Sequence, residues 1–131
     1  MKITLISIGK TDNKQLQALI DDYINRLGFY VSFNFVVIPD IKKAKNLSEV
    51  QQKKAEGLEI EKRISSSDSV VLLDENGKSF NSIGFSKFLQ KNMNSGLKNL
   101  VLVIGGPYGF SNEMYQRANG KVSLSEMTFS H

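Results

Sequence analysis

The chain has 131 residues, of which 40% are hydrophobic and 23% charged, so we expect one soluble domain, residues 1–131, with a sizeable core. It contains no cysteine and a single histidine, which excludes disulfides, thiolate chemistry and metal sites built from cysteine or from several histidines. The net charge of +4 is compatible with a polyanionic partner.

Short β-rich runs alternate with longer amphipathic stretches along the chain. The predicted strands are Lys2–Ile8, Val31–Ile38, Ser69–Asp74, Asn99–Ile104 and Lys121–Ser125. The third and fourth runs are apolar at consecutive positions, as strands buried on both faces are. No apolar run approaches the roughly 20 residues of a membrane helix, and the first residues read as a strand rather than a secretory signal. We therefore expect a cytoplasmic protein.

Apolar residues at helical spacing predict two helices that face the core. They are Leu16, Leu19, Ile20, Tyr23 and Leu27 in the first and Phe85, Phe88, Leu89 and Met93 in the second. The stretch 47–64 is rich in charge and has only a thin apolar stripe, which predicts a mostly solvated segment. Ser111 is expected to cap a short helix that runs through Ala118, and the Asn-Gly pair within Glu75–Lys78 is typical of a turn.

This order of elements predicts parallel strands joined by helical crossovers, and hence an α/β three-layer sandwich. Ligands of such sheets bind in the loops beyond the carboxyl ends of the strands. The loops after Leu73, Ile104 and Leu124 are therefore the candidate binding loops.

Two glycine-containing loops follow predicted strands. Gly9-Lys10-Thr11 lacks the earlier glycine of a phosphate-binding loop and reads as a turn before a helix capped by Asp12. Ile104-Gly105-Gly106-Pro107 does not fit a dinucleotide loop, because Pro107 removes an amide donor. The residues alone leave two readings for this second loop, a tight structural turn or the wall of a ligand pocket.

Few titratable side chains stand out. Asp74, at the end of the third strand, is either a functional carboxylate or the cap of a turn. His131 and the run Lys42, Lys43 and Lys45 are expected to be solvated. A signalling receiver would share the alternating pattern, but it needs acidic residues where the first strand here ends in Gly9-Lys10.

Four motifs occur together in an order and spacing that resemble one protein family. They are Met1-Lys2-Ile3-Thr4 leading to Ile8-Gly9-Lys10, Leu73-Asp74 followed by Gly77-Lys78, the loop Val103-Ile104-Gly105-Gly106-Pro107-x-Gly109, and Leu124-Ser125-x-Met127-Thr128-Phe129-Ser130-His131. Over its whole length the sequence resembles the ribosomal RNA large subunit methyltransferase H family of small SPOUT-class enzymes. Ser130 departs from the proline that is usual in the family.

The resemblance implies transfer of a methyl group from S-adenosylmethionine to N3 of a pseudouridine in 23S ribosomal RNA, on the assembled ribosome and without a metal. It implies a trefoil-knotted SPOUT fold and a homodimer. The implied cofactor contacts are Leu73, Gly105, Leu124, Ser125, Glu126, Met127, Thr128 and Phe129. They fall in the three candidate binding loops, where backbone groups can bind a flat adenine and Leu73, Met127 and Phe129 can supply apolar walls. The resemblance assigns no catalytic residue here.

Family members continue beyond the position of His131 for about one more helix and a short tail, which complete the knot, the dimer interface and the catalytic surface. The sequence therefore predicts an incomplete knot, a poorly supported segment Leu124–Phe129 and little or no methylation by this form. The alternative function is that of a non-catalytic form that binds only the cofactor or the ribosome.

Overall fold

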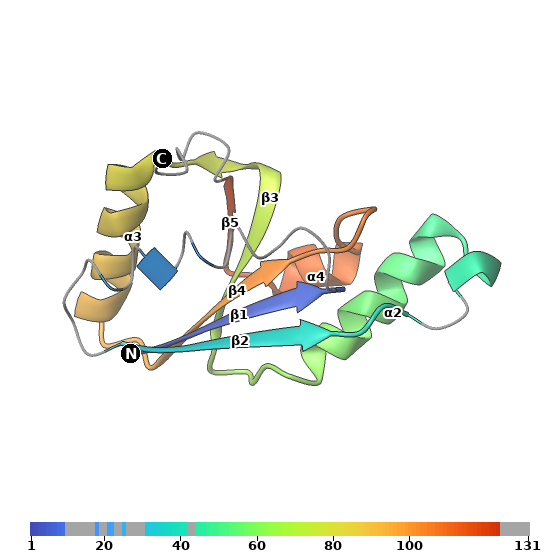
Figure 1. Cartoon of the computed structure of the whole chain (residues 1–131), viewed down its shortest axis with the longest axis horizontal. Coiled ribbons are helices and arrows are strands. Elements are labelled where there is room, and N and C mark those ends of the chain that lie inside the picture. Colours follow the sequence, from blue (N-terminus) through green and yellow to red (C-terminus); the bar gives the residue numbers. More distant parts are fainter. Residues whose placement is uncertain (10–17, 19–20, 23–24, 26–30, 42–43, 124–131) are drawn as a thin grey trace.

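The computed structural model describes residues 1–9, 18, 21, 22, 25, 31–41 and 44–123 (Figure 1). Five parallel strands form one sheet in the order β2-β1-β4-β3-β5. The strands are β1 (Lys2–Ile8), β2 (Ser32–Ile38), β3 (Ser69–Ser79), β4 (Asn99–Ile104) and β5 (Gly120–Ser123). In the described part of the chain, the helices after β2 are the 3-10 turn η1 (Ala44–Asn46), α2 (Glu49–Glu61), α3 (Ser82–Asn94) and α4 (Asn112–Arg117).

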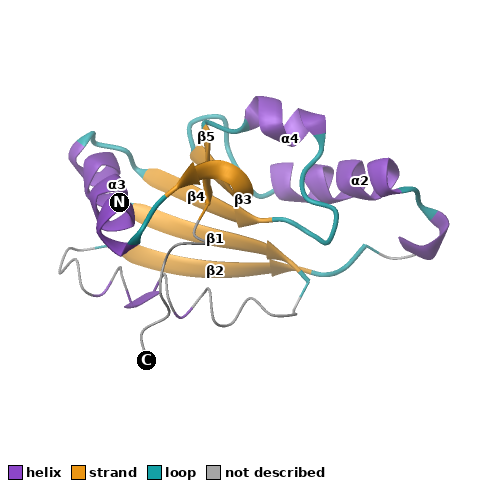
Figure 2. Cartoon of the chain, turned by 90° about the horizontal axis from the view of Figure 1, so that it is seen from above, coloured by secondary structure: helices purple, strands orange, loops and turns teal. Residues whose placement is uncertain are grey.

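Helices cover both faces of the sheet, which confirms the predicted α/β class and parallel strands. Figure 2 shows α2 and α4 together on one side of the sheet. On the other face, Phe85 and Leu89 of α3 pack against a cluster whose strand residues are Ile3, Leu5, Val71, Leu100, Leu102 and Val122. The alternate residues of β1, β3 and β4 lie on the opposite face, toward α2, because side chains along a strand alternate between its two faces.

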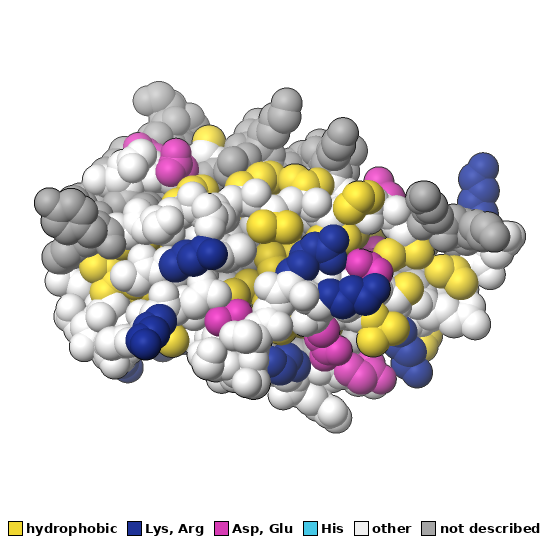
Figure 3. All heavy atoms as spheres, turned by 90° about the horizontal axis from the view of Figure 1, so that it is seen from below, with side chains coloured by type: hydrophobic (Ala, Val, Ile, Leu, Met, Phe, Trp, Pro, Cys, Tyr) yellow, Lys and Arg dark blue, Asp and Glu magenta, His cyan; other side chains and the backbone are white. Residues whose placement is uncertain are grey.

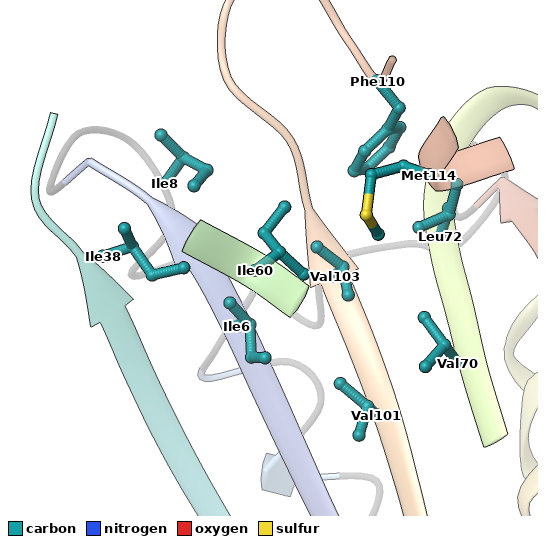
Figure 4. Close-up of a cluster of buried hydrophobic side chains, with 10 residues drawn as sticks. All are labelled: Ile6, Ile8, Ile38, Ile60, Val70, Leu72, Val101, Val103, Phe110 and Met114. Carbon is teal, nitrogen blue, oxygen red and sulfur yellow. The ribbon is translucent and has the colours of Figure 1, made fainter. Parts of the chain in front are cut away.

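The cluster on the α2 side is drawn in Figure 4. Ile60 of α2, Met114 of α4 and Phe110 before α4 pack onto the strands. The strand residues are Ile6, Ile8, Ile38, Val70, Leu72, Val101 and Val103. Consecutive apolar residues in β3 and β4 thus serve two separate cores, which is why those runs do not alternate with polar residues.

The predicted cap at Ser111 and the predicted core face of the helix through Phe85 and Leu89 are confirmed. Ser111 precedes α4, and its hydroxyl accepts a hydrogen bond from the Met114 amide at 3.2 Å. In α3, Phe85 and Leu89 are fully buried and Phe88 is half-buried. The expected helix at 16–27 lies mostly outside the described residues, of which positions 18, 21, 22 and 25 are helical.

Helix α2 is mostly solvated, as predicted, but not entirely. Its capping box is complete: the Ser48 hydroxyl accepts from the Gln51 amide and the Gln51 side chain accepts from the Ser48 amide. Three of its residues are buried: Glu56, Gly57 and Ile60. A buried glutamate is an unexpected element of this stripe.

The prediction that Glu75–Lys78 ends the third strand in a turn is wrong, because β3 continues to Ser79. Leu73 and Lys78 both align with Val122 of β5, so the residues between them form an irregular insertion within the strand. The Asn-Gly pair does produce a local turn contact, in which the Asn76 amide donates to the Asp74 carboxylate at 3.0 Å. After this turn, Lys78 and Ser79 pair with β5 and so extend β3. This pairing is a tertiary contact, which the local sequence signal does not contain.

Several predictions concern residues outside the described part of the chain. They include the turn at Lys10–Asp12, the run Lys42 and Lys43, the end of the fifth strand beyond Ser123, and Leu124–His131 with the knot that this segment would form. Lys45, in η1, is exposed as expected.

Candidate functional site

Two of the predicted cofactor contacts, Leu73 and Gly105, lie near each other at the level of the sheet where β4 ends. Leu73 pairs with Ile104 across β3 and β4, and Gly105 follows directly. On its other side Leu73 pairs with Val122, near the end of β5. The remaining predicted contacts, Leu124–Phe129, lie outside the described residues. In the sequence they directly follow β5, the strand that pairs with β3 at Leu73.

The loop after β4 is a tight turn folded onto Phe110. The Gly109 amide donates to the Gly106 carbonyl at 3.2 Å, and Gly109 has a φ of 84°, in the left-handed region that favours glycine. A Cβ at Gly105 would lie 3.1 Å from the Phe110 ring. One of the two readings of this loop, the tight structural turn, is therefore confirmed, and the ligand wall stays a prediction.

Behind this loop lies Glu56, which sequence reasoning missed. The residue is only 3% exposed, and a Cβ at Gly106 would lie 2.5 Å from its Oε2 atom. Burial raises the pKa of the Glu56 carboxyl; the hydrogen bond from Gln52 opposes this rise, and the nearby negative charge of Asp40 adds to it. The one signal in the sequence is that Glu56 precedes Ile60 by one helical turn and so shares its buried stripe.

Asp74 caps the irregular turn in β3 and also binds Tyr115 of α4. The Tyr115 hydroxyl donates to Asp74 Oδ2, while Asp74 Oδ1 accepts from the Asn76 amide. The hydrogen bond to Asp74, burial, and the charge of Asp74 together raise the pKa of Tyr115 to about 12. Tyr115 also packs edge-on against Phe110, with the Lys121 ammonium 5.4 Å from its ring centre. Asp74 thus has the structural role that the sequence left open, and Tyr115 is a partner that the sequence did not indicate.

This contact gives a direct prediction. Replacing Asp74 by asparagine should lower the pKa of Tyr115 from about 12 toward 10.0, because the negative acceptor that stabilises the neutral phenol is removed. A pH titration followed by the ultraviolet absorbance of the phenolate measures the pKa of Tyr115. The Tyr115→Phe variant assigns the signal, and Glu75→Gln is the matched control. If the pKa of Tyr115 stays near 12 in Asp74→Asn, the contact with Asp74 is not what raises it.

Comparison with known proteins identifies the family to which these motifs belong. A family model described as a predicted SPOUT methyltransferase matches residues 1–131. A protein named ribosomal RNA large subunit methyltransferase H from Flavobacterium johnsoniae is 65% identical over all of this chain and 83% of its own length. The chain belongs to the ribosomal RNA large subunit methyltransferase H family. Proteins of the same name from Flavobacterium psychrophilum and Parabacteroides distasonis are 62% and 55% identical over the same shares.

Membership in a SPOUT methyltransferase family implies that the protein uses a methyl donor. The pair Leu73 and Gly105 fits such a group, because Leu73 is a half-buried apolar side chain and Gly105 has no side chain of its own, with the Phe110 ring packed on the side where a Cβ would stand. Among the described residues, no cluster of acidic or histidine side chains could hold a metal ion. None of the described helices is long and apolar enough to cross a bilayer.

The charged surface of this SPOUT family member is mixed on the face shown in Figure 3. Lysine and arginine side chains lie singly or beside aspartate and glutamate there. One basic residue of the last third has a structural role, since the Arg117 guanidinium donates to the carbonyls of Ser65 at 2.8 Å and Asp68 at 3.2 Å. This contact ties α4 to the turn that precedes β3.

Proposed function

We propose that this protein transfers the methyl group of S-adenosylmethionine to N3 of a pseudouridine in 23S ribosomal RNA on the assembled ribosome in the cytoplasm. Membership in the family supports methyl transfer, and the names of the relatives support a ribosomal RNA substrate. The structural observation that carries the proposal is that Leu73 of β3 pairs with Ile104, the last residue of β4, directly before Gly105.

In this proposal, main-chain groups at Leu73 of β3, after β4 and after β5 bind the methyl donor. Leu73 provides an apolar wall, Gly105 allows close approach of the backbone, and Leu124–Phe129 complete the site after β5. Bound S-adenosylmethionine would supply a methyl group already activated on a sulfonium. The chain's own task is then to align that methyl with the nucleophile and to exclude water. A cationic sulfonium needs no phosphate cradle, so Pro107 in the loop is no obstacle.

The charge of the chain suits an RNA substrate. The segment from Phe85 to His131 carries five basic residues against two acidic ones, which is +3 of the total net charge of +4. They are Lys87, Lys91, Lys98, Arg117 and Lys121 against Glu113 and Glu126. Basic residues neutralise phosphates, and a pseudouridine in a single-stranded loop can be turned out of its stack into a pocket. We further propose that the active species is a homodimer.

Two measurements on the same preparation test the proposal. Calorimetric titration should show S-adenosylmethionine binding. In an incubation with ribosomes and the methyl-labelled donor, whatever label is transferred should lie on a 23S pseudouridine, identified by mass spectrometry of the nucleosides. Binding without transfer would support the non-catalytic alternative. Absence of donor binding, or a label on another nucleoside, would contradict the proposal.

A further inference from the structure

Glu56 is a buried carboxyl with one unpaired oxygen. The residue is 3% exposed, and Gln52 Nε2 donates to its Oε2 atom at 3.2 Å. Its Oε1 atom is buried and has no hydrogen-bond partner among the described residues. A buried polar atom without a partner costs free energy, so stability alone does not account for a carboxyl at this position.

The carboxyl lies against the glycine loop after β4. A Cβ at Gly106 would lie 2.5 Å from Oε2, 2.7 Å from Oε1 and 2.8 Å from the carboxyl carbon of Glu56. The space that a side chain at residue 106 would occupy is therefore filled by Glu56 itself. Figure 1 shows α2 and this loop at the end of the sheet marked by the arrowheads of β1, β2 and β4.

The surroundings of Glu56 favour its neutral form over its charged form. Asp40, which follows β2, is a charged neighbour of Glu56, and Gln52 on the same helix as Glu56 provides a neutral donor. Ser111, which precedes α4, and Met114 of α4 approach the adjacent Gly57, and neither carries a charge. Burial and the negative charge of Asp40 both raise the pKa of Glu56, so its carboxyl is more easily protonated than an exposed glutamate.

We propose that Glu56 is a positioning residue for methyl transfer: its carboxyl holds the backbone at Gly106 and so fixes how Gly105 meets the methyl donor. The role rests on the proposed function in one respect only, namely that Gly105 contacts the donor. Contact between the carboxyl and the loop is a property of the donor-free protein. Glu56 itself neither touches the donor nor takes part in the chemical step.

Three variants on α2 test this proposal. Glu56→Ala removes the carboxyl, Glu56→Gln keeps its size and one oxygen, and Glu61→Ala is a matched control at an exposed glutamate of the same helix. In the donor-free protein, the amide resonances of Gly105 and Gly106 should move in Glu56→Ala, move little in Glu56→Gln and stay unchanged in Glu61→Ala. Affinity for S-adenosylmethionine should fall about tenfold in Glu56→Ala and should be largely restored in Glu56→Gln.

The pH dependence of donor affinity gives a readout that a merely structural role would not move, whereas the pH dependence of stability follows from the raised pKa of Glu56 in either case. Because the pKa of Glu56 is raised above 4.5 in the folded protein, the native state binds this proton more tightly than the unfolded state. The contribution of that proton to stability is complete below 4.5 and is lost as the pH rises through the folded pKa. Wild type should therefore become less stable relative to Glu56→Gln over that range, and its donor affinity should depend on pH where that of Glu56→Gln does not.

The outcomes separate this inference from the proposed function. Unchanged Gly105 and Gly106 resonances in Glu56→Ala, or equal damage by Glu56→Ala and Glu56→Gln, would overturn the positioning role. If Glu56→Ala does not fold, Gly106→Ala probes the same contact from the loop side and must move the same resonances. Failure of wild type to bind S-adenosylmethionine would contradict the proposed function, while the donor-free resonances would still decide whether Glu56 holds the loop.

Discussion

Replacing Gly77 by alanine should destabilise the fold by about 1–3 kcal/mol and weaken binding of the methyl donor. A Cβ at this position would lie 2.6 Å from the carbonyl carbon of Lys121 and 2.6 Å from the amide nitrogen of Val122. Both atoms are backbone atoms of β5, so they cannot turn aside as a flexible side chain can. The variant must push β5 away from β3 and thereby displace the proposed cofactor segment that follows β5.

Chemical denaturation and calorimetric titration of the donor measure the two effects. Gly120→Ala is the matched control, because a Cβ at Gly120 meets no described atom within 4 Å. Gly120 lies on β5 itself, so the comparison separates the clash from a general cost of replacing glycine. A Gly77→Ala protein as stable as Gly120→Ala would show that β3 and β5 are not pressed together at this point.

Replacing Gly106 by alanine should also cost about 1–3 kcal/mol of folding free energy and reduce donor affinity. The clash is with the Glu56 carboxyl, which is the end of a side chain and could move aside in a solvated site. Here Glu56 is 3% exposed and has Asp40 as a charged neighbour, so displacing its carboxyl costs more than it would at the surface. We therefore expect the loop to shift instead.

A double-mutant cycle checks this explanation. If the carboxyl causes the damage, Gly106→Ala should cost much less in a Glu56→Ala background than in wild type, because the space is then free. Free energies of unfolding of the four proteins give the coupling. Purely additive effects would mean that the two residues do not interact and would remove the physical basis for the positioning role.

The layered fold was predictable because the pattern of apolar and polar residues in each strand indicates which of its faces are buried. Consecutive apolar residues in β4 indicate burial on both faces, and the structure divides Leu102 and Val103 between the two cores. The extent of β3 was not predictable in the same way. The Asn-Gly signal at residues 76 and 77 is local, whereas pairing of Lys78 with Val122 depends on a strand more than forty residues later.

The candidate site was predictable only at its strand ends. The rule that ligands bind beyond the carboxyl ends of parallel strands indicates the loops after Leu73 and Ile104, and their adjacency follows from the strand order. Glu56 and Tyr115 could not be found in this way. A charged residue on a largely solvated helix is expected at the surface, and the hydrogen bond from Tyr115 to Asp74 joins residues 41 positions apart.

The most direct test of this account is to titrate the isotope-labelled protein with S-adenosylmethionine and follow the backbone amide resonances. We expect saturable shifts centred on Leu73 within β3 and on Gly105 directly after β4, together with residues after β5, and much smaller shifts at the amino ends of the strands. Shifts that cluster around another part of the molecule, or none at saturating donor, would contradict it.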